Sequence, residues 1–223
     1  MLISNRIDGE IMKVIRDTNE SEMILEFLKG ELNSNRFNKD LLKILDKLKL
    51  DKNIIINGDI SNSDENNKRL EIMNLYRGYP NKELFENFPV INEWKYCKLS
   101  SEDINKIYYI DYDYWNILSN NTSSPIEAAK NIKSGVEVFD VSNKPFIDGV
   151  KCLENSSFPP VILITCNDER YLIIEGHSRM TIYAFSPDKL EGTYAYVGYC
   201  SKEEMKKYDP RMLSGESLKS RKY

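Results

Sequence analysis

Along the first half of the chain, apolar residues recur every three or four positions, which is the spacing of one face of an α-helix. The pattern predicts helices over residues 21–29, 37–48 and 65–77, with a short helical turn at 82–88. We expect Gly30 to end the first helix and Gly78 to end the third, because glycine readily takes the left-handed conformation that follows a last helical turn. The buried side of the third helix is predicted to carry three apolar residues: Leu70, Met73 and Leu75.

The secondary structure of two stretches in this half is left open by the pattern. The apolar run 54–56 is too short to assign by periodicity, and it fits a strand or a buried extended segment. Residues 1–20 are polar and mixed in charge, which fits a helix or a loosely held arm. The N-terminal part is therefore predicted to be mostly helical.

The second half mixes strand-like and helix-like segments. Strands are predicted at 136–141, 161–164, 171–174 and 193–198, and the middle two form a hairpin whose turn is Asn167-Asp168. Helices are predicted to start near residue 100, to cover 125–135 and 145–153, and to return in 201–223 before a basic tail at 219–222. In the helix 125–135, Ser124 and Glu127 fit a capping box, Pro125 fits the first helical position, and Gly135 is the matching stop.

This order of elements predicts an α+β fold, with a small mixed β-sheet, flanking helices and an N-terminal helical layer. We divide the chain into three parts. Residues 1–99 are a mostly helical extension packed on the core, residues 100–200 are the α+β core, and residues 201–223 are a C-terminal helix with the basic tail.

The only histidine lies where a predicted strand turns into a predicted helix, in the stretch Glu175-Gly176-His177-Ser178-Arg179. Ser178 can cap the helix, and the free backbone N–H groups and dipole of a helix start favour an anion. The His177 and Arg179 side chains add donors, and Thr181 follows within one turn. The stretch therefore predicts a small phosphate pocket. Equally, His177 could cap the helix or bond to a neighbouring loop.

The same stretch resembles the ParB/sulfiredoxin superfamily. The resemblance rests on the strand pair 161–164 and 171–174, the turn Glu175–Arg179, and the preceding helix 125–135, which ends on glycine. In that superfamily, a strand hairpin feeds a Gly-His-His-Arg or Gly-Cys-His-Arg turn that holds nucleotide phosphates. The resemblance covers roughly residues 100–200 and implies nucleotide binding at Gly176, His177, Ser178, Arg179 and Thr181.

Departures from the family pattern narrow what the resemblance implies. Sulfiredoxins have their reactive cysteine where this chain has His177, so that chemistry is not expected here, and Ser178 replaces the histidine that follows. Only about twenty residues follow Ser201, too few for the helix-turn-helix of partition proteins. The remaining analogues are the superfamily's small-molecule kinases, nucleotide-hydrolysing switches and nuclease-labelled members.

Charge and composition exclude several other classes. The formal net charge is −4, whereas general nucleic-acid binders are usually basic, so nucleic acid is not expected as a partner. The four cysteines form no C-x-x-C pair, so no metal site is expected. No P-loop motif and no Ser-His-Asp or Cys-His arrangement stands out. Without a secretory signal or an apolar run of spanning length, we expect a cytoplasmic protein with no membrane contact.

Several further residues are candidates for the site. Glu175 could act as a base, bind Mg²⁺ beside phosphates, or pair with Arg179. Asp111 and Asp113 would share one face of a strand and could bind a cation, although the polar side of an amphipathic segment is the favoured interpretation. Three more polar residues could bind a ligand or serve only to cap helices and loops: Arg77, Asn121 and Thr122.

Three hypotheses about function follow. The first is a nucleotide-binding protein, with ATP among the candidates and Mg²⁺ travelling with the nucleotide. It would hydrolyse the nucleotide or transfer a phosphoryl group, with Glu175 and His177 as the catalytic residues. The second is a non-enzymatic interaction protein that keeps the fold and binds a protein partner. The third is a nuclease.

Overall fold

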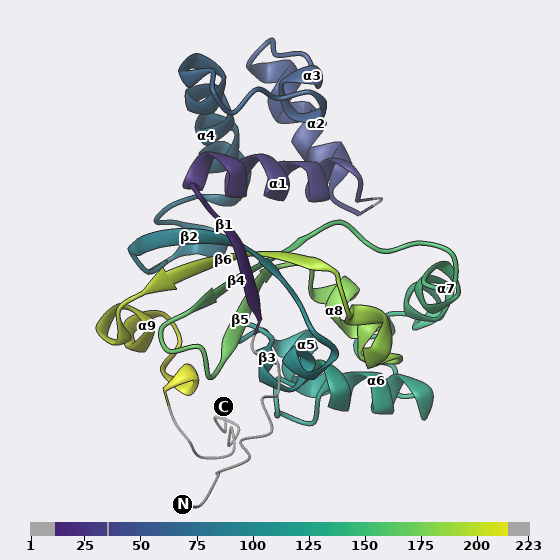
Figure 1. Cartoon of the computed structure of the whole chain (residues 1–223). Coiled ribbons are helices and arrows are strands. Elements are labelled where there is room, and N and C mark those ends of the chain that lie inside the picture. The colour runs from purple at the N-terminus through teal and green to yellow at the C-terminus, as the bar shows by residue number, and fades with distance from the viewer. Residues whose placement is uncertain (1–11, 35, 214–223) are drawn as a thin grey trace, which may run out of the picture.

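The computed structural model describes residues 12–34 and 36–213. A six-stranded mixed sheet forms the centre of the fold (Figure 1). The strand order is β1-β2-β6-β4-β5-β3. Neighbours pair antiparallel except at β4–β6 and β3–β5, which are parallel. The strands are β1 Lys13–Thr18, β2 Ile91–Lys98, β3 Ile107–Tyr108, β4 Val161–Thr165, β5 Tyr171–Glu175 and β6 Tyr194–Cys200.

Helices cover both faces of this sheet, as Figure 1 shows. The N-terminal helices form one layer: α1 Glu20–Leu32, α2 Asn38–Lys47, α3 Asn53–Ile56 and α4 Ser63–Arg77. The remaining helices are α5 Asp113–Leu118, α6 Pro125–Lys133, α7 Lys144–Cys152, α8 His177–Tyr183 and α9 Lys202–Tyr208. Short 3₁₀ turns lie at Glu83–Phe85, Ser101–Lys106, Pro187–Leu190 and Pro210–Met212.

The central strands are buried on both faces, so alternate residues enter two different cores. In β4, Ile162 and Ile164 pack with the helical layer, while Val161 and Leu163 pack with α6 and α8. The hairpin of β4 and β5 is confirmed, with Asp168 in the left-handed region of its turn. The predicted α+β architecture, with a mixed sheet and flanking helices, is confirmed.

Two strands that lie before residue 100 belong to the same sheet. Residues 13–18, expected as a helix or loose arm, form the edge strand β1, because β2 offers them an antiparallel partner, with one register shift between Val14 and Arg16. The helical layer is therefore inserted between β1 and β2 in the sequence. Residues 1–11 and the basic tail at 219–222 lie outside the described residues.

Helix α1 does not end at Gly30, contrary to the sequence prediction. It begins after Asn19, whose side chain accepts from Glu22 N at 3.1 Å, and it continues to Leu32. Gly30 therefore lies inside the helix. Its missing side chain allows a neighbouring side chain to pack closely and does not serve to end the helix. Gly78 does end α4, with φ of 74°, as predicted.

Three other local predictions are wrong. Residues 54–56 belong to the short helix α3. On α4 the buried residues include Ile72, Met73 and Tyr76, whereas Leu70 and Leu75 are exposed, because the buried face is rotated from the one we assigned. Residues 136–141 form a tight turn with a single bridge between Val138 and Val141 rather than a strand.

The start of α6 is only partly as predicted. Pro125 occupies the first turn, but the Ser124 side chain makes no capping hydrogen bond. Glu127 instead pairs with Lys130 at 2.6 Å. The helix boundary is therefore right, while the capping box is not formed.

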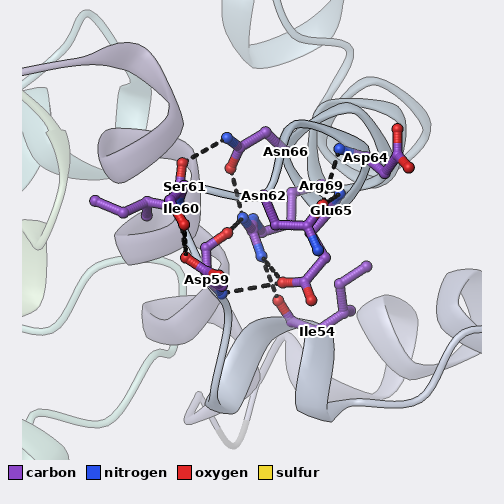
Figure 2. Close-up of polar contacts among 9 residues, drawn as sticks. All are labelled: Ile54, Asp59, Ile60, Ser61, Asn62, Asp64, Glu65, Asn66 and Arg69. Carbon is purple, nitrogen blue, oxygen red and sulfur yellow. Dashed lines mark hydrogen bonds and ion pairs between the residues drawn. The ribbon is translucent and has the colours of Figure 1, made fainter.

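A buried arginine fixes the loop that leads into α4 (Figure 2). Arg69 has no exposed surface, and it donates to the carbonyl oxygens of Ile54 at 2.9 Å and Asp59 at 2.8 Å. Its guanidinium also contacts Glu65 at 2.9 Å and the Asn66 side chain at 2.5 Å. Buried charge is tolerated only with such partners, so Arg69 is a structural centre of the helical layer.

Candidate functional site

A pocket of about 920 Å³ lies between the helical layer and the turn that joins β5 to α8. We call it the interlayer pocket. Its volume falls in the range of roughly 300–1,000 Å³ that is typical of ligand sites. Helix α1 and the segment after it form one wall, and the stretch Glu175–Arg179 forms the opposite wall. The predicted stretch Glu175–Arg179 therefore lines this pocket, and Arg77 lines it from the helical layer.

The turn itself has the predicted strand–glycine–helix geometry. Gly176 has φ of 101°, a conformation that other residues rarely adopt, and a Cβ there would lie 2.5 Å from Val161 Cγ1. Helix α8 begins at His177, and no side chain caps its first turn. Ser178 is exposed and is not the N-cap that we predicted, because Gly176 holds that position.

The His177 ring packs against aromatic rings, and the residue as a whole is half-buried. Its imidazole lies nearly parallel to the Trp115 ring, 5.4 Å away and inclined by 16°, and to the Tyr109 ring at 6.0 Å. Nε2 is buried without a hydrogen-bond partner among the described residues. Burial lowers the pKa of His177 to about 3, so the imidazole is neutral at pH 7. In this arrangement His177 lines the pocket with a neutral ring and adds no charge to it.

Arg179 is already occupied by protein groups. Its guanidinium forms an ion pair with Glu175 and donates to the carbonyl oxygens of Pro159 at 2.8 Å and Pro160 at 2.5 Å. Burial lowers the pKa of Arg179 to about 10, which still leaves the side chain charged at pH 7. The pair neutralises Glu175, so neither residue presents an uncompensated charge to a ligand. The geometry supports the ion-pair interpretation of Glu175 over that of a free base.

Thr181 lies in the core below the turn, outside the walls of the pocket. It has no exposed surface, and its hydroxyl contacts the Tyr109 hydroxyl at 2.6 Å and donates to the His177 carbonyl at 2.8 Å. Through these contacts Thr181 positions Tyr109, on which His177 stacks. We therefore assign it a supporting role rather than direct phosphate contact.

The aspartates proposed as a same-face pair lie in different structures. Asp113 begins helix α5, and Asp111 precedes it in a bend, so the expected strand is absent there. Asp111 accepts from Asn116 at 2.7 Å and lies 3.6 Å from Arg211. It lines a smaller cavity of about 410 Å³ that shares the wall residues Leu84, Ile110 and Tyr112 with the interlayer pocket.

Asn121 and Thr122 shape a loop outside both cavities. The Asn121 N–H donates to the Asn116 carbonyl at 2.7 Å, and the Thr122 hydroxyl donates to the Ser119 carbonyl at 2.7 Å. Asn121 also has a positive φ of 61°. These contacts match the alternative of loop capping.

Sequence reasoning missed the α1 wall of the pocket. Glu26 and Lys29 lie one turn apart on α1, and Arg36 follows the helix. Burial raises the pKa of the Glu26 carboxyl, while Lys29 and Arg179 oppose that shift. The i, i+3 spacing of Glu26 and Lys29 was visible in the sequence, but nothing there showed that this side of α1 faces the turn after β5.

The comparisons leave the chain without an assigned family. No protein-family model matches it, and neither a curated protein nor a solved structure shows significant similarity to it. Among the described helices, none has the length and apolar character needed to cross a bilayer.

Proposed function

We propose that this chain binds a nucleotide in the interlayer pocket. The observation that carries the proposal is that one pocket is lined both by cations that form no ion pair among the described residues and by aromatic rings. Lys29 and Arg36 have no ion pair among the described residues, and Tyr112 and Trp115 line the same pocket. Phosphates match the cations and a base matches the rings. The uncapped first turn of α8 adds backbone donors on the opposite wall.

Binding can be tested by calorimetric titration with ATP, ADP, CTP and GTP, each with Mg²⁺. Tyr112 is 58% exposed, so Tyr112→Ala should preserve the fold while it removes a stacking surface. Loss of one stacked base contact should weaken binding by roughly tenfold. Tyr194→Ala is the matched control, because Tyr194 is exposed on β6 away from the pocket. No heat with any nucleotide would end the proposal, as would equal effects of the two variants.

Hydrolysis or phosphoryl transfer is the catalytic part of this proposal. The reaction needs positioned cations for the transferred phosphate and a carboxylate to orient or deprotonate the nucleophile. Glu26 fits the second role better than Glu175, because it lines the pocket without an ion pair among the described residues and its pKa is raised. In this proposal Mg²⁺ is carried by the phosphates. Phosphate release that Glu26→Gln abolishes without loss of nucleotide affinity would support the role.

An interaction protein is the second candidate, and one surface favours it. The connection between α6 and α7 exposes three large apolar residues, Val136, Phe139 and Val141, and Ile147 on α7 is exposed as well. Phe139 is 64% exposed at the tip of the tight turn. A protein partner that protects this turn from hydrogen exchange would support this function. The nuclease hypothesis and the cytoplasmic location stay predictions.

A further inference from the structure

One aromatic ring holds two guanidinium groups at the helical wall of the interlayer pocket. The Cζ atoms of Arg36 and Arg77 lie 4.8 Å and 4.4 Å from the centroid of the Phe37 ring. All three residues line the pocket. Cation–π attraction favours each contact, so the ring keeps two like charges together that would otherwise repel each other.

The charge of this arrangement is only partly compensated. Glu31 pairs with Arg77 and accepts a hydrogen bond from Tyr76, so a buried carboxylate anchors one of the two guanidiniums. Arg36 is exposed and forms no ion pair with any described residue. The Arg77 Nε atom is buried and has no hydrogen-bond partner among the described residues. The wall thus presents a fixed arginine beside one whose donors are free for a ligand.

We propose that Arg36 and Arg77 bind the outer phosphates of a nucleoside di- or triphosphate. This inference rests on the proposed function and names the ligand class within it. A guanidinium presents a planar fork of donors that matches phosphate oxygens. A monophosphate brings one anionic group to the pocket, whereas a di- or triphosphate brings a separate group for each guanidinium. Phe37 is a positioning residue that brings the two arginines to one place.

In this proposal the base of such a ligand contacts Tyr112 and Trp115, the aromatic residues of the same pocket. The assignment therefore makes a prediction about phosphate number that does not depend on which base is bound. Affinity should rise from AMP to ADP to ATP, and tripolyphosphate should bind without any base.

The test is calorimetry with AMP, ADP, ATP and tripolyphosphate on the full chain and three variants. We expect ATP to bind at least about tenfold more tightly than AMP, the size of one charged hydrogen bond. Arg36→Ala and Phe37→Leu should each reduce that ratio toward one. Lys68→Ala is the control, because it removes one exposed cation from α4 outside the pocket and should leave the ratio unchanged.

The outcomes separate this inference from the proposed function. Equal affinities for AMP and ATP, or a ratio that survives Arg36→Ala, overturn the inference and leave nucleotide binding intact. Tripolyphosphate binding without nucleotide binding overturns the proposed function and also the nucleotide as the ligand of the two arginines. Absence of binding by all four probes overturns both. Circular dichroism checks the fold, and if Phe37→Leu unfolds, the exposed Arg36 variant decides.

Discussion

Gly30 of helix α1 lies directly against the carboxylate of Glu175 at the end of β5. A Cβ atom on Gly30 would lie 3.1 Å from both Cδ and Oε1 of that side chain. The Glu175 carboxylate is held in place by Arg179, so it has little freedom to move away. The helical layer and the turn between β5 and α8 therefore meet at a position where only glycine fits without displacing a neighbour.

Gly30→Ala should not bring the usual gain of a helical alanine. That gain is roughly 0.5–1 kcal/mol, but here the methyl group presses on the fixed carboxylate. In a Glu175→Ala background the obstacle is removed, and Gly30→Ala should then stabilise the protein. Urea unfolding of the wild type, the two single variants and the double variant measures the difference. An equal effect in both backgrounds would show that the two residues do not interact.

Breaking the Glu175–Arg179 pair should destabilise the fold. The two side chains are only 16% and 14% exposed, so Arg179→Met leaves a mostly buried carboxylate without its cation. We expect a loss of roughly 3 kcal/mol in unfolding free energy, and a smaller loss when Glu175→Gln is added. Lys144→Met, at a pair whose lysine is 77% exposed, should cost less than about 1 kcal/mol. Equal losses at the two pairs would contradict the assigned burial.

Stability should decrease on acidification because of the single histidine. The pKa of His177 is lowered to about 3 in the fold, and an unfolded histidine titrates near 6.5. Below about pH 6.5 the unfolded chain therefore binds a proton that the native chain does not. This contribution is fully present above that pH and decreases by roughly 1.4 kcal/mol per pH unit down to about pH 3.

The measurement is urea unfolding of the wild type and of His177→Phe between pH 4 and 7. Phenylalanine keeps a ring on Trp115 and cannot titrate. The variant should therefore lose less stability on acidification than the wild type. Parallel curves for both proteins would place the imidazole in solvent and contradict the stacked arrangement.

Removal of the Arg69 side chain should loosen the helical layer. Arg69→Met leaves the carbonyl oxygens of Ile54 and Asp59 without their donor, so we expect a loss of more than about 2 kcal/mol. Gly58→Ala should act in the same direction, because its Cβ would lie 2.5 Å from Arg69 Nη1. Lys68→Ala should change stability by less than about 0.5 kcal/mol. Hydrogen exchange at residues 54–62 shows whether the loop opens.

Phe139 should be replaceable with a gain in stability. It has a φ of 53°, in the left-handed region that costs a bulky side chain roughly 1–2 kcal/mol, and it is largely exposed. Phe139→Asn should therefore stabilise the protein by about 1 kcal/mol. Ile147→Asn, at an exposed apolar position of helix α7, should bring no gain. A loss with Phe139→Asn would contradict the strained turn.

Local patterns predicted the elements whose signals lie within a few residues. The hairpin of β4 and β5, the helices α2, α4 and α7, and the stop at Gly78 follow from periodicity and from glycine's freedom at positive φ. The strand–turn–helix at Glu175–Arg179 was predictable for the same reason. The strand at residues 13–18 could not be predicted in this way, because an edge strand depends on its partner β2, which lies more than 70 positions later in the sequence.

The sequence by itself determined the secondary structure around His177 and the residue types that line that turn. Only the tertiary structure decided the protonation and the hydrogen-bond partners of these side chains. The imidazole is neutral because Trp115 and Tyr109 bury it, and Arg179 is occupied because two proline carbonyls converge on it. The cations that form no ion pair among the described residues come from α1 and the segment after it, about 140 residues before the turn. Charge and protonation depend on neighbours in space, and a linear pattern records neighbours only along the chain.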